Sequence, residues 1–163
     1  MLTLDMVLDS SIYGLWRFGM YPPDEPRIAA TMRAIADQLL NRGSTGGIAR
    51  YTDDYYFKVE TDTKKVPGNP WFMCTFWLAQ WYIATAKKVD DLDLARQFID
   101  WAVAHQTPGG LLSEQLDPNT GAPVSVSPLT WSHAELIVTV DDLCRKAERL
   151  RRAATPPRAL PLS

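Results

Sequence analysis

Apolar residues recur at helical spacing in five segments, separated by loops that carry most of the glycines and prolines. The first segment, residues 3–13, is short and is predicted to end near Gly14. The second begins at Pro26, a residue favoured in the first turn of a helix, and Gly43 closes it. Its apolar positions fall on one face, which predicts a helix that packs on one side: Ile28, Met32, Ile35, Ala36, Leu39 and Leu40.

The third helical segment is apolar on nearly every face. Asn69 and Pro70 predict its N-cap and first turn, and the helix is expected to run from Trp71 to about Lys87. A helix that is apolar all round is buried on all sides. Four other short helices can hardly cover it, so the pattern indicates that the chain belongs to a larger body.

Two further helices complete the pattern. Asp90 or Asp91 caps the fourth, and the fifth begins at Thr130 or Ser132, where Ser132 and Glu135 predict a capping box. Residues 149–163 are basic and then proline-rich, and we expect them to form a disordered tail. Because no segment shows the alternation of a strand, the predicted fold is all-α, with successive helices antiparallel.

Composition narrows the class of protein. The 163 residues are 46% hydrophobic and 22% charged, which suits one folded domain. A net charge of −2 does not provide the excess of positive charge that is typical of proteins that bind nucleic acid. The longest apolar stretch, residues 71–86, is shorter than the roughly 20 residues needed to span a bilayer, and the start lacks a signal-peptide pattern. We therefore expect a soluble, cytoplasmic protein without nucleic-acid or membrane partners.

The metal-binding residue types are sparse. Cys74 and Cys144 lie far apart within apolar helical patterns, which favours two buried free thiols. Only two histidines occur, and there is no glycine-rich phosphate loop. We expect neither a metal ion nor another cofactor.

The long connection over residues 44–68 is a candidate ligand site. Connections of this length in compact domains are usually functional or disordered, and its aromatic content argues against disorder. Arg50, Asp53 and Asp54 combine a planar donor with acceptors, the mixture that a polyhydroxylated ligand requires. A surface Arg–Asp pair of little energetic value is an equally open interpretation.

A loop glutamate and two tryptophans are further candidates. Glu114 stands between apolar neighbours, where partial burial or hydrogen bonding would make it an acid or a base. A solvated surface glutamate is the commoner alternative. Trp71 and Trp131 lie at helix starts beside loops, as core residues or as platforms for a sugar.

Together these loops resemble the C-terminal half of glycoside hydrolase family 15, which holds glucoamylases, glucodextranases and bacterial trehalase-like enzymes. The resemblance runs from about Ser11 to Arg145, in order and in spacing. The matching segments are residues 47–54 (GIARYTDD), 68–72 (GNPWF), 110–115 (GLLSEQ) and 128–134 (PLTWSHA).

The resemblance implies a fold and a site. The family's catalytic domain is an (α/α)6 toroid, of which residues 1–148 would form a C-terminal portion built of antiparallel helical hairpins. The family inverts the anomeric centre of α-glucosides with two glutamates, and Glu114 resembles the general base. The other implied roles are glucose binding for Arg50, lining of the sugar site for Asp54 and Trp71, a place beside the base for Trp131, and an acidic loop position for Asp53.

The family's general acid is a glutamate in the first half of the toroid. Glu25 and Glu60 are the other loop glutamates here, and neither stands in a matching motif. An inverting enzyme needs its two carboxyl groups about 6.5–9.5 Å apart. We therefore expect this chain to carry the general-base half of the site and to lack the acid.

Three hypotheses follow from the expected lack of the general acid. The first is a portion of an inverting hydrolase of α-glucosides or oligosaccharides, with the missing N-terminal half or a self-association partner beside it. The second is a non-catalytic helical module that binds carbohydrate or another protein. The third is a decayed remnant that exposes apolar surface and self-associates. Whether the sugar is a maltodextrin, an α-1,6-glucan or trehalose is left open.

Overall fold

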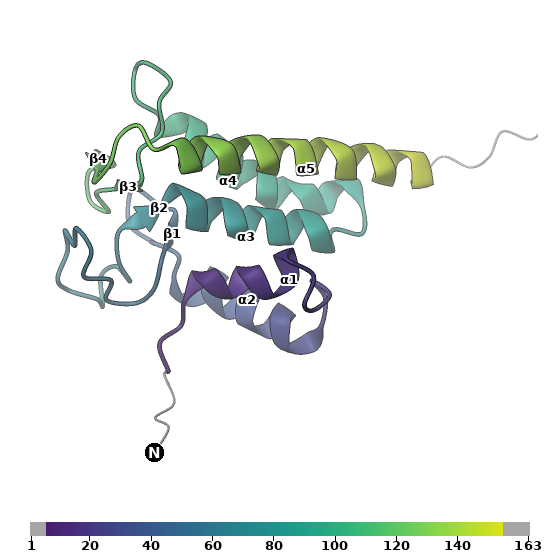
Figure 1. Ribbon diagram of the computed structural model, residues 1–163, viewed down its shortest axis with the longest axis horizontal. Helices are drawn as coiled ribbons and strands as arrows, with labels where there is room; N and C mark the ends of the chain where they lie inside the picture. The colour runs from purple at the N-terminus through teal and green to yellow at the C-terminus, as the bar shows by residue number, and fades with distance from the viewer. Residues whose placement is uncertain (1–5, 155–163) are drawn as a thin grey trace, which may run out of the picture.

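The computed structural model describes residues 6–154 and is mostly helical (Figure 1). The helical elements are η1 (Ser10–Tyr13), α1 (Gly14–Arg17), α2 (Pro26–Gln38), α3 (Phe72–Thr85), η2 (Val89–Leu92), α4 (Asp93–Ala104) and α5 (Thr130–Ala154). The described strands are β1 (Ile48–Ala49), β2 (Pro70–Trp71), β3 (Gln115–Leu116) and β4 (Pro123–Val124).

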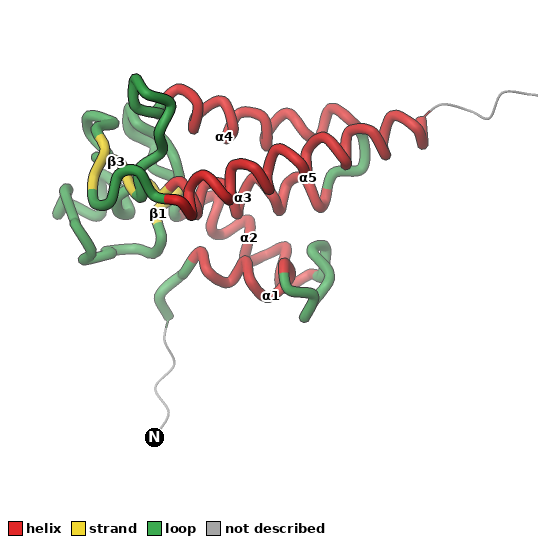
Figure 2. Tube along the Cα trace, turned by 45° about the horizontal axis from the view of Figure 1, so that its top comes forward, coloured by secondary structure: helices red, strands yellow, loops and turns green. Residues whose placement is uncertain are grey.

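The strands form a small antiparallel sheet in the order β1-β2-β3-β4. The sheet and its loops lie together at one end of the helices (Figure 2). The sheet is a small addition to the predicted all-α fold. Each strand has two residues, which is too short for the alternation that identifies a strand in a sequence.

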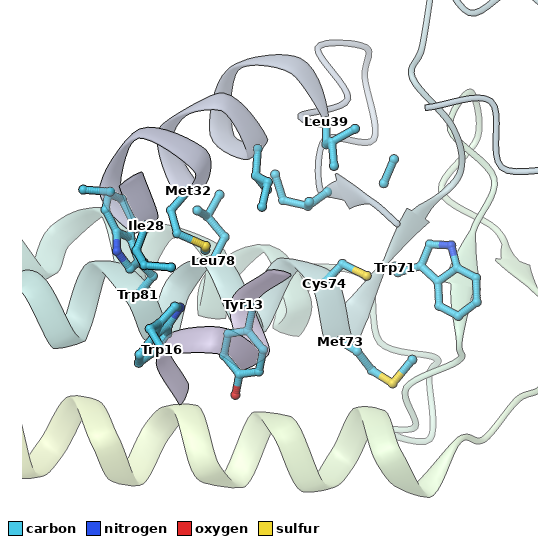
Figure 3. Packing of buried hydrophobic residues seen from close by; sticks show 14 residues of the cluster. Tyr13, Trp16, Ile28, Met32, Leu39, Trp71, Met73, Cys74, Leu78 and Trp81 are labelled. Carbon is cyan, nitrogen blue, oxygen red and sulfur yellow. The ribbon is translucent and has the colours of Figure 1, made fainter. Parts of the chain in front are cut away.

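Helix α3 runs through the middle of the molecule, as its apolar circumference predicts. Phe72, Phe76 and Leu78 are fully buried, and Leu78 lies near Trp16 and Trp81 on the side that faces α1 and α2 (Figure 3). The expectation that the chain's own helices could hardly cover α3 is wrong. Helices α2, α4 and α5 and the turn η1 all pack against it.

Exposed apolar residues gather on α5 instead. Its side chains at four positions are open to solvent: Trp131, Ile137, Val138 and Val140. The same helix packs along α3, and its buried residues are Ser132, Thr139 and Ala147.

Two predicted helix caps do not form, although α5 begins at Thr130, one of its two predicted starts. Asn69 does not cap α3: Pro70 and Trp71 form β2, and the helix begins at Phe72. Ser132 and Glu135 form no capping box, because the Ser132 hydroxyl donates to the Ser113 carbonyl. In both places a contact with a distant segment replaces the local cap.

The two ends of the helical pattern also differ from prediction. The first helical turn begins at Ser10, and α1 continues past Gly14 because that glycine has ordinary helical dihedral angles. Helix α5 continues through Arg149 to Ala154, so the first part of the expected tail is helical. Residues 1–5 and 155–163, which include the rest of that tail, lie outside the described residues. No helix within residues 6–154 has the length and apolarity to cross a membrane.

The two cysteines differ in burial. Cys74 is buried, as expected, whereas Cys144 is exposed on α5, so the expectation of two buried thiols is wrong for Cys144. Burial raises the pKa of the Cys74 thiol to about 12. Because thiolates are the reactive species, we expect a thiol reagent at pH 8 to modify Cys144 alone in the folded chain, and both cysteines after unfolding. Mass spectrometry of the modified peptides tests this, and modification of both thiols at similar rates in the folded chain would contradict it.

Candidate functional site

The sheet brings together three segments that carry candidate residues. Strand β1 leads directly into Arg50, β2 contains Trp71, and β3 begins at Gln115, immediately after Glu114. In the register of the sheet, Trp71 lies opposite Ile48 on one side and opposite Gln115 on the other. Arg50 and Glu114 therefore flank the strand that holds Trp71, at the same end of the molecule.

Arg50 and Asp54 form a bidentate ion pair. Arg50 Nε lies 2.8 Å from Asp54 Oδ2, and Nη2 lies 2.6 Å from Oδ1. Asp54 is only 2% exposed, and its Oδ1 also accepts the backbone N–H of Tyr56 at 3.0 Å. This fork geometry at a buried carboxylate distinguishes the pair from a weak surface ion pair.

Three aromatic rings surround the Arg50 guanidinium. Its central carbon lies 4.6 Å from the ring centroid of Trp71, 4.8 Å from that of Tyr51 and 5.6 Å from that of Tyr56. Burial disfavours the charge on Arg50, but the hydrogen bonds and charge of Asp54 outweigh it and raise the pKa of the guanidinium. Within the described residues Nη1 donates no hydrogen bond, so the arrangement presents a fixed cation with a free donor beside aromatic faces.

Asp53 does not join this cluster. Its carboxylate pairs with Lys58, and its side chain is 62% exposed. The residue has a φ of 65°, in the left-handed region, which turns the chain between Arg50 and Asp54. The structure therefore gives Asp53 a place in the turn and not beside Arg50.

Glu114 is half-buried, and its two carboxylate oxygens have different surroundings. Oε2 accepts a hydrogen bond from the Ser125 hydroxyl and lies 3.5 Å from Gln115 Nε2. Oε1 accepts no hydrogen bond from the described part of the chain. The Glu114 backbone is held by Val126 on one side and by Phe72 N–H on the other, at 2.8 and 3.3 Å. The carboxylate is thus fixed by one oxygen, and the other is left for a ligand or water.

The two candidate tryptophans have different environments. Trp71 is buried beneath Arg50. Trp131 is 52% exposed, packs against Trp77 with ring centroids 6.0 Å apart, and donates its Nε1–H to Glu135. It lines a hollow of about 420 Å³ between α1 and α5, together with Tyr13 and Arg17. The structure thus places Trp71 with Arg50, and Trp131 in the first turn of α5, directly after the loop that carries Glu114.

Several residues of the site are not among those singled out from the sequence: Tyr51, Tyr56, Asn69, Gln115 and Ser125. The two tyrosines belong to the connection over residues 44–68, which the sequence predicts as a candidate site as a whole. Gln115 follows Glu114 in its motif. Ser125 lies in a proline-containing loop with no signal of its own.

Comparison with known proteins identifies the class. The model of the family "Glycosyl hydrolases family 15" matches residues 4–93 and 89–141. This chain therefore belongs to glycosyl hydrolase family 15.

Relatives include an uncharacterized glycosyl hydrolase of Methanocaldococcus jannaschii, 32% identical over 147 residues, which cover 84% of this chain and 22% of the relative. A glucoamylase of a Clostridium species is 31% identical over 81% of this chain and 19% of its own length. A trehalase of Mycolicibacterium smegmatis is 28% identical over 88% of this chain and 20% of its own length. The chain thus spans about a fifth of these relatives.

The fold comparison agrees. A bacterial glucoamylase solved in complex with acarbose superposes with a TM-score of 0.70 at 24% identity, over 88% of this chain and 23% of that structure. The expected fold class is confirmed: the antiparallel helices form part of an (α/α)6 toroid.

Proposed function

We propose that this chain carries the general-base half of the active site of an inverting, glucoamylase-like hydrolase, with Glu114 as the base. The observation that carries the proposal is the asymmetry of the Glu114 carboxylate. Ser125 and Gln115 lie at Oε2, whereas Oε1 has no partner within residues 6–154. A general base needs a fixed carboxylate with one oxygen open to the water that it activates.

In the proposed reaction, Glu114 Oε1 takes a proton from water as the water oxygen forms a bond to the anomeric carbon. The glycosidic C–O bond breaks at the same carbon, and the leaving oxygen receives a proton from a carboxylic acid on the opposite face of the sugar. That acid would come from the N-terminal half of the toroid. Attack from the face opposite the leaving group inverts the anomeric centre.

Arg50, Asp54 and Trp71 are the residues proposed to hold the sugar. Arg50 Nη1 offers a donor to a sugar hydroxyl, and Asp54 fixes the guanidinium plane. Tyr56, which is 37% exposed and whose ring centroid lies 6.0 Å from that of Trp71, adds an apolar surface for sugar C–H groups. The substrate class proposed on this basis is an α-glucoside or oligosaccharide. The acarbose complex of the glucoamylase relative supports a ligand of this kind.

A complementation experiment tests the proposal. The chain is mixed with the N-terminal portion of a family 15 enzyme that carries the general acid, and hydrolysis of maltose, isomaltose and trehalose is followed by ¹H NMR. We expect activity only in the mixture, hereafter the assembled enzyme, and the glucose that carries the cleaved anomeric carbon should be released as the β-anomer. The chain alone is expected to be inactive, because general acid catalysis contributes about 10²–10⁴-fold. Sugar binding without hydrolysis in any mixture would instead favour the non-catalytic module.

Ser125 is expected to assist Glu114 without being essential. In Ser125→Ala the carboxylate loses the hydroxyl that fixes Oε2, and kcat of the assembled enzyme is expected to fall about fivefold, as for the loss of one modest hydrogen bond. Ser127→Ala, an exposed position in the same loop, serves as the control. Equal activity of the two variants in steady-state kinetics would show that the Ser125 contact has no role.

A further inference from the structure

Asn69 joins the two halves of the candidate site. It is 3% exposed, precedes β2, and contacts both the loop that follows Asp54 and the strand that follows Glu114. We propose that Asn69 is a positioning residue that fixes the side-chain amide of Gln115, so that Gln115 presents an N–H, and not a carbonyl oxygen, to the Glu114 carboxylate. This inference rests on the proposed role of Glu114 as the base.

Two backbone groups determine the orientation of the Asn69 amide. The N–H of Val59 donates to Asn69 Oδ1 at 3.3 Å, and the carbonyl oxygen of Phe57 accepts from Asn69 Nδ2 at 2.8 Å. A backbone N–H is always a donor and a backbone carbonyl always an acceptor. A flipped Asn69 would face each of them with the wrong group, so only one orientation satisfies both.

The orientation of Asn69 is transmitted to Gln115. Asn69 Nδ2 donates to Gln115 Oε1 at 2.9 Å, and Gln115 is completely buried. With its oxygen engaged by Asn69, Gln115 has only its NH₂ group left for Glu114, at 3.5 Å from Oε2. A flipped Gln115 would place two NH₂ groups against each other and a carbonyl oxygen against the carboxylate. Both contacts are unfavourable in a buried place.

The same amide also holds the loop on the Arg50 side. Phe57, whose carbonyl accepts from Asn69, has a φ of 53°, which is strained for a bulky residue. Its ring contacts Tyr56, one of the rings beside Arg50. Asn69 therefore stabilises the strained turn next to the Arg50 cluster and the donor next to Glu114 through one side chain.

A double-mutant cycle in the assembled enzyme tests the proposal. Asn69→Leu and Gln115→Met are each expected to lower kcat about fivefold. Gln115→Met should leave KM nearly unchanged, whereas Asn69→Leu should also raise KM, because it releases the turn beside Arg50. The double variant is expected to have the same kcat as Gln115→Met alone, because Asn69 acts on Glu114 through Gln115. Asn41→Leu, at a buried asparagine that contacts Pro118 and Gly43 outside the site, is the matched control and should keep kcat. Additive losses of kcat, or a rise in KM alone, would overturn the proposal.

A spectroscopic measurement on the chain itself separates this proposal from the proposed function. In the chain that keeps Asn69, Glu114→Gln is expected to shift the side-chain amide resonances of Gln115 in a ¹⁵N–¹H spectrum. In Asn69→Leu the same substitution is expected to leave them unmoved, because the amide is no longer fixed toward residue 114. Equal responses in both backgrounds would refute the role of Asn69, whatever the activity. If the responses differ as expected but Glu114→Gln does not reduce hydrolysis, the positioning role stands and the general-base proposal fails.

Discussion

Glu114→Gln is expected to lower kcat of the assembled enzyme by about 10²–10⁴-fold, the range typical of a lost general base. The amide has nearly the shape of the carboxylate and can still contact Ser125, but it cannot take a proton from water. KM is expected to change little, because the sugar is proposed to be held by Arg50 and Asp54. Steady-state kinetics on maltose measures both values.

Two further variants sharpen this test. Glu60→Gln alters another loop glutamate, whose carboxylate accepts a local N–H from Asp62, and kcat should stay unchanged. Glu114→Ala should regain turnover when azide is added, since azide attacks the anomeric carbon without losing a proton. A glycosyl azide of inverted configuration is the expected product. Full activity of Glu114→Gln in the absence of azide would remove Glu114 from the mechanism.

Arg50→Lys is expected to weaken sugar binding by about tenfold to a hundredfold. Lysine provides a point charge in place of the planar fork, so the two bonds to Asp54, the contacts with three rings and the free donor at Nη1 cannot all be replaced. Titration of the assembled enzyme with acarbose, followed by the fluorescence of Trp71 and its neighbours, measures the change in Kd.

The matched control for this variant is Arg42→Lys. Arg42 also pairs with an aspartate, Asp37, but both side chains are largely exposed, and such pairs contribute little. Sugar affinity should be unaffected by this change. If Arg50→Lys likewise keeps the affinity, the Arg50 cluster is a structural ion pair and not a sugar site.

The sequence predicts the long helices and misses the short elements for a physical reason. Helices α2, α3 and α5 carry enough turns for their apolar periodicity to appear. The strands are held by pairing between residues far apart in the chain, such as Trp71 with Gln115, and two residues cannot show a period. For the same reason Asn69 and Ser132 resemble local caps but bind distant groups.

The contacts within the site could likewise be predicted only in part. Arg50 and Asp54 are four residues apart, so their pairing could be suspected from the sequence, and the structure confirms the contact. The partners of Glu114 could be recognised only in part. Gln115 is its neighbour, but Ser125 reaches it through the pairing of β3 with β4. The roles of Glu114, Asp53 and Trp131 in a reaction stay predictions until the variants are measured.

The sheet also sets the order in which the site can form during synthesis. Arg50 and Trp71 can meet once α3 has left the ribosome, but Glu114 takes its position only when Val126 has emerged to accept its backbone N–H. The pairing of Trp71 with Gln115 also joins residues farther apart in the chain than the pairing of Ile48 with Trp71, so its loop-closure cost is larger. A nascent chain halted after α4 would therefore contain Arg50, Asp54 and the aromatic rings but not Glu114.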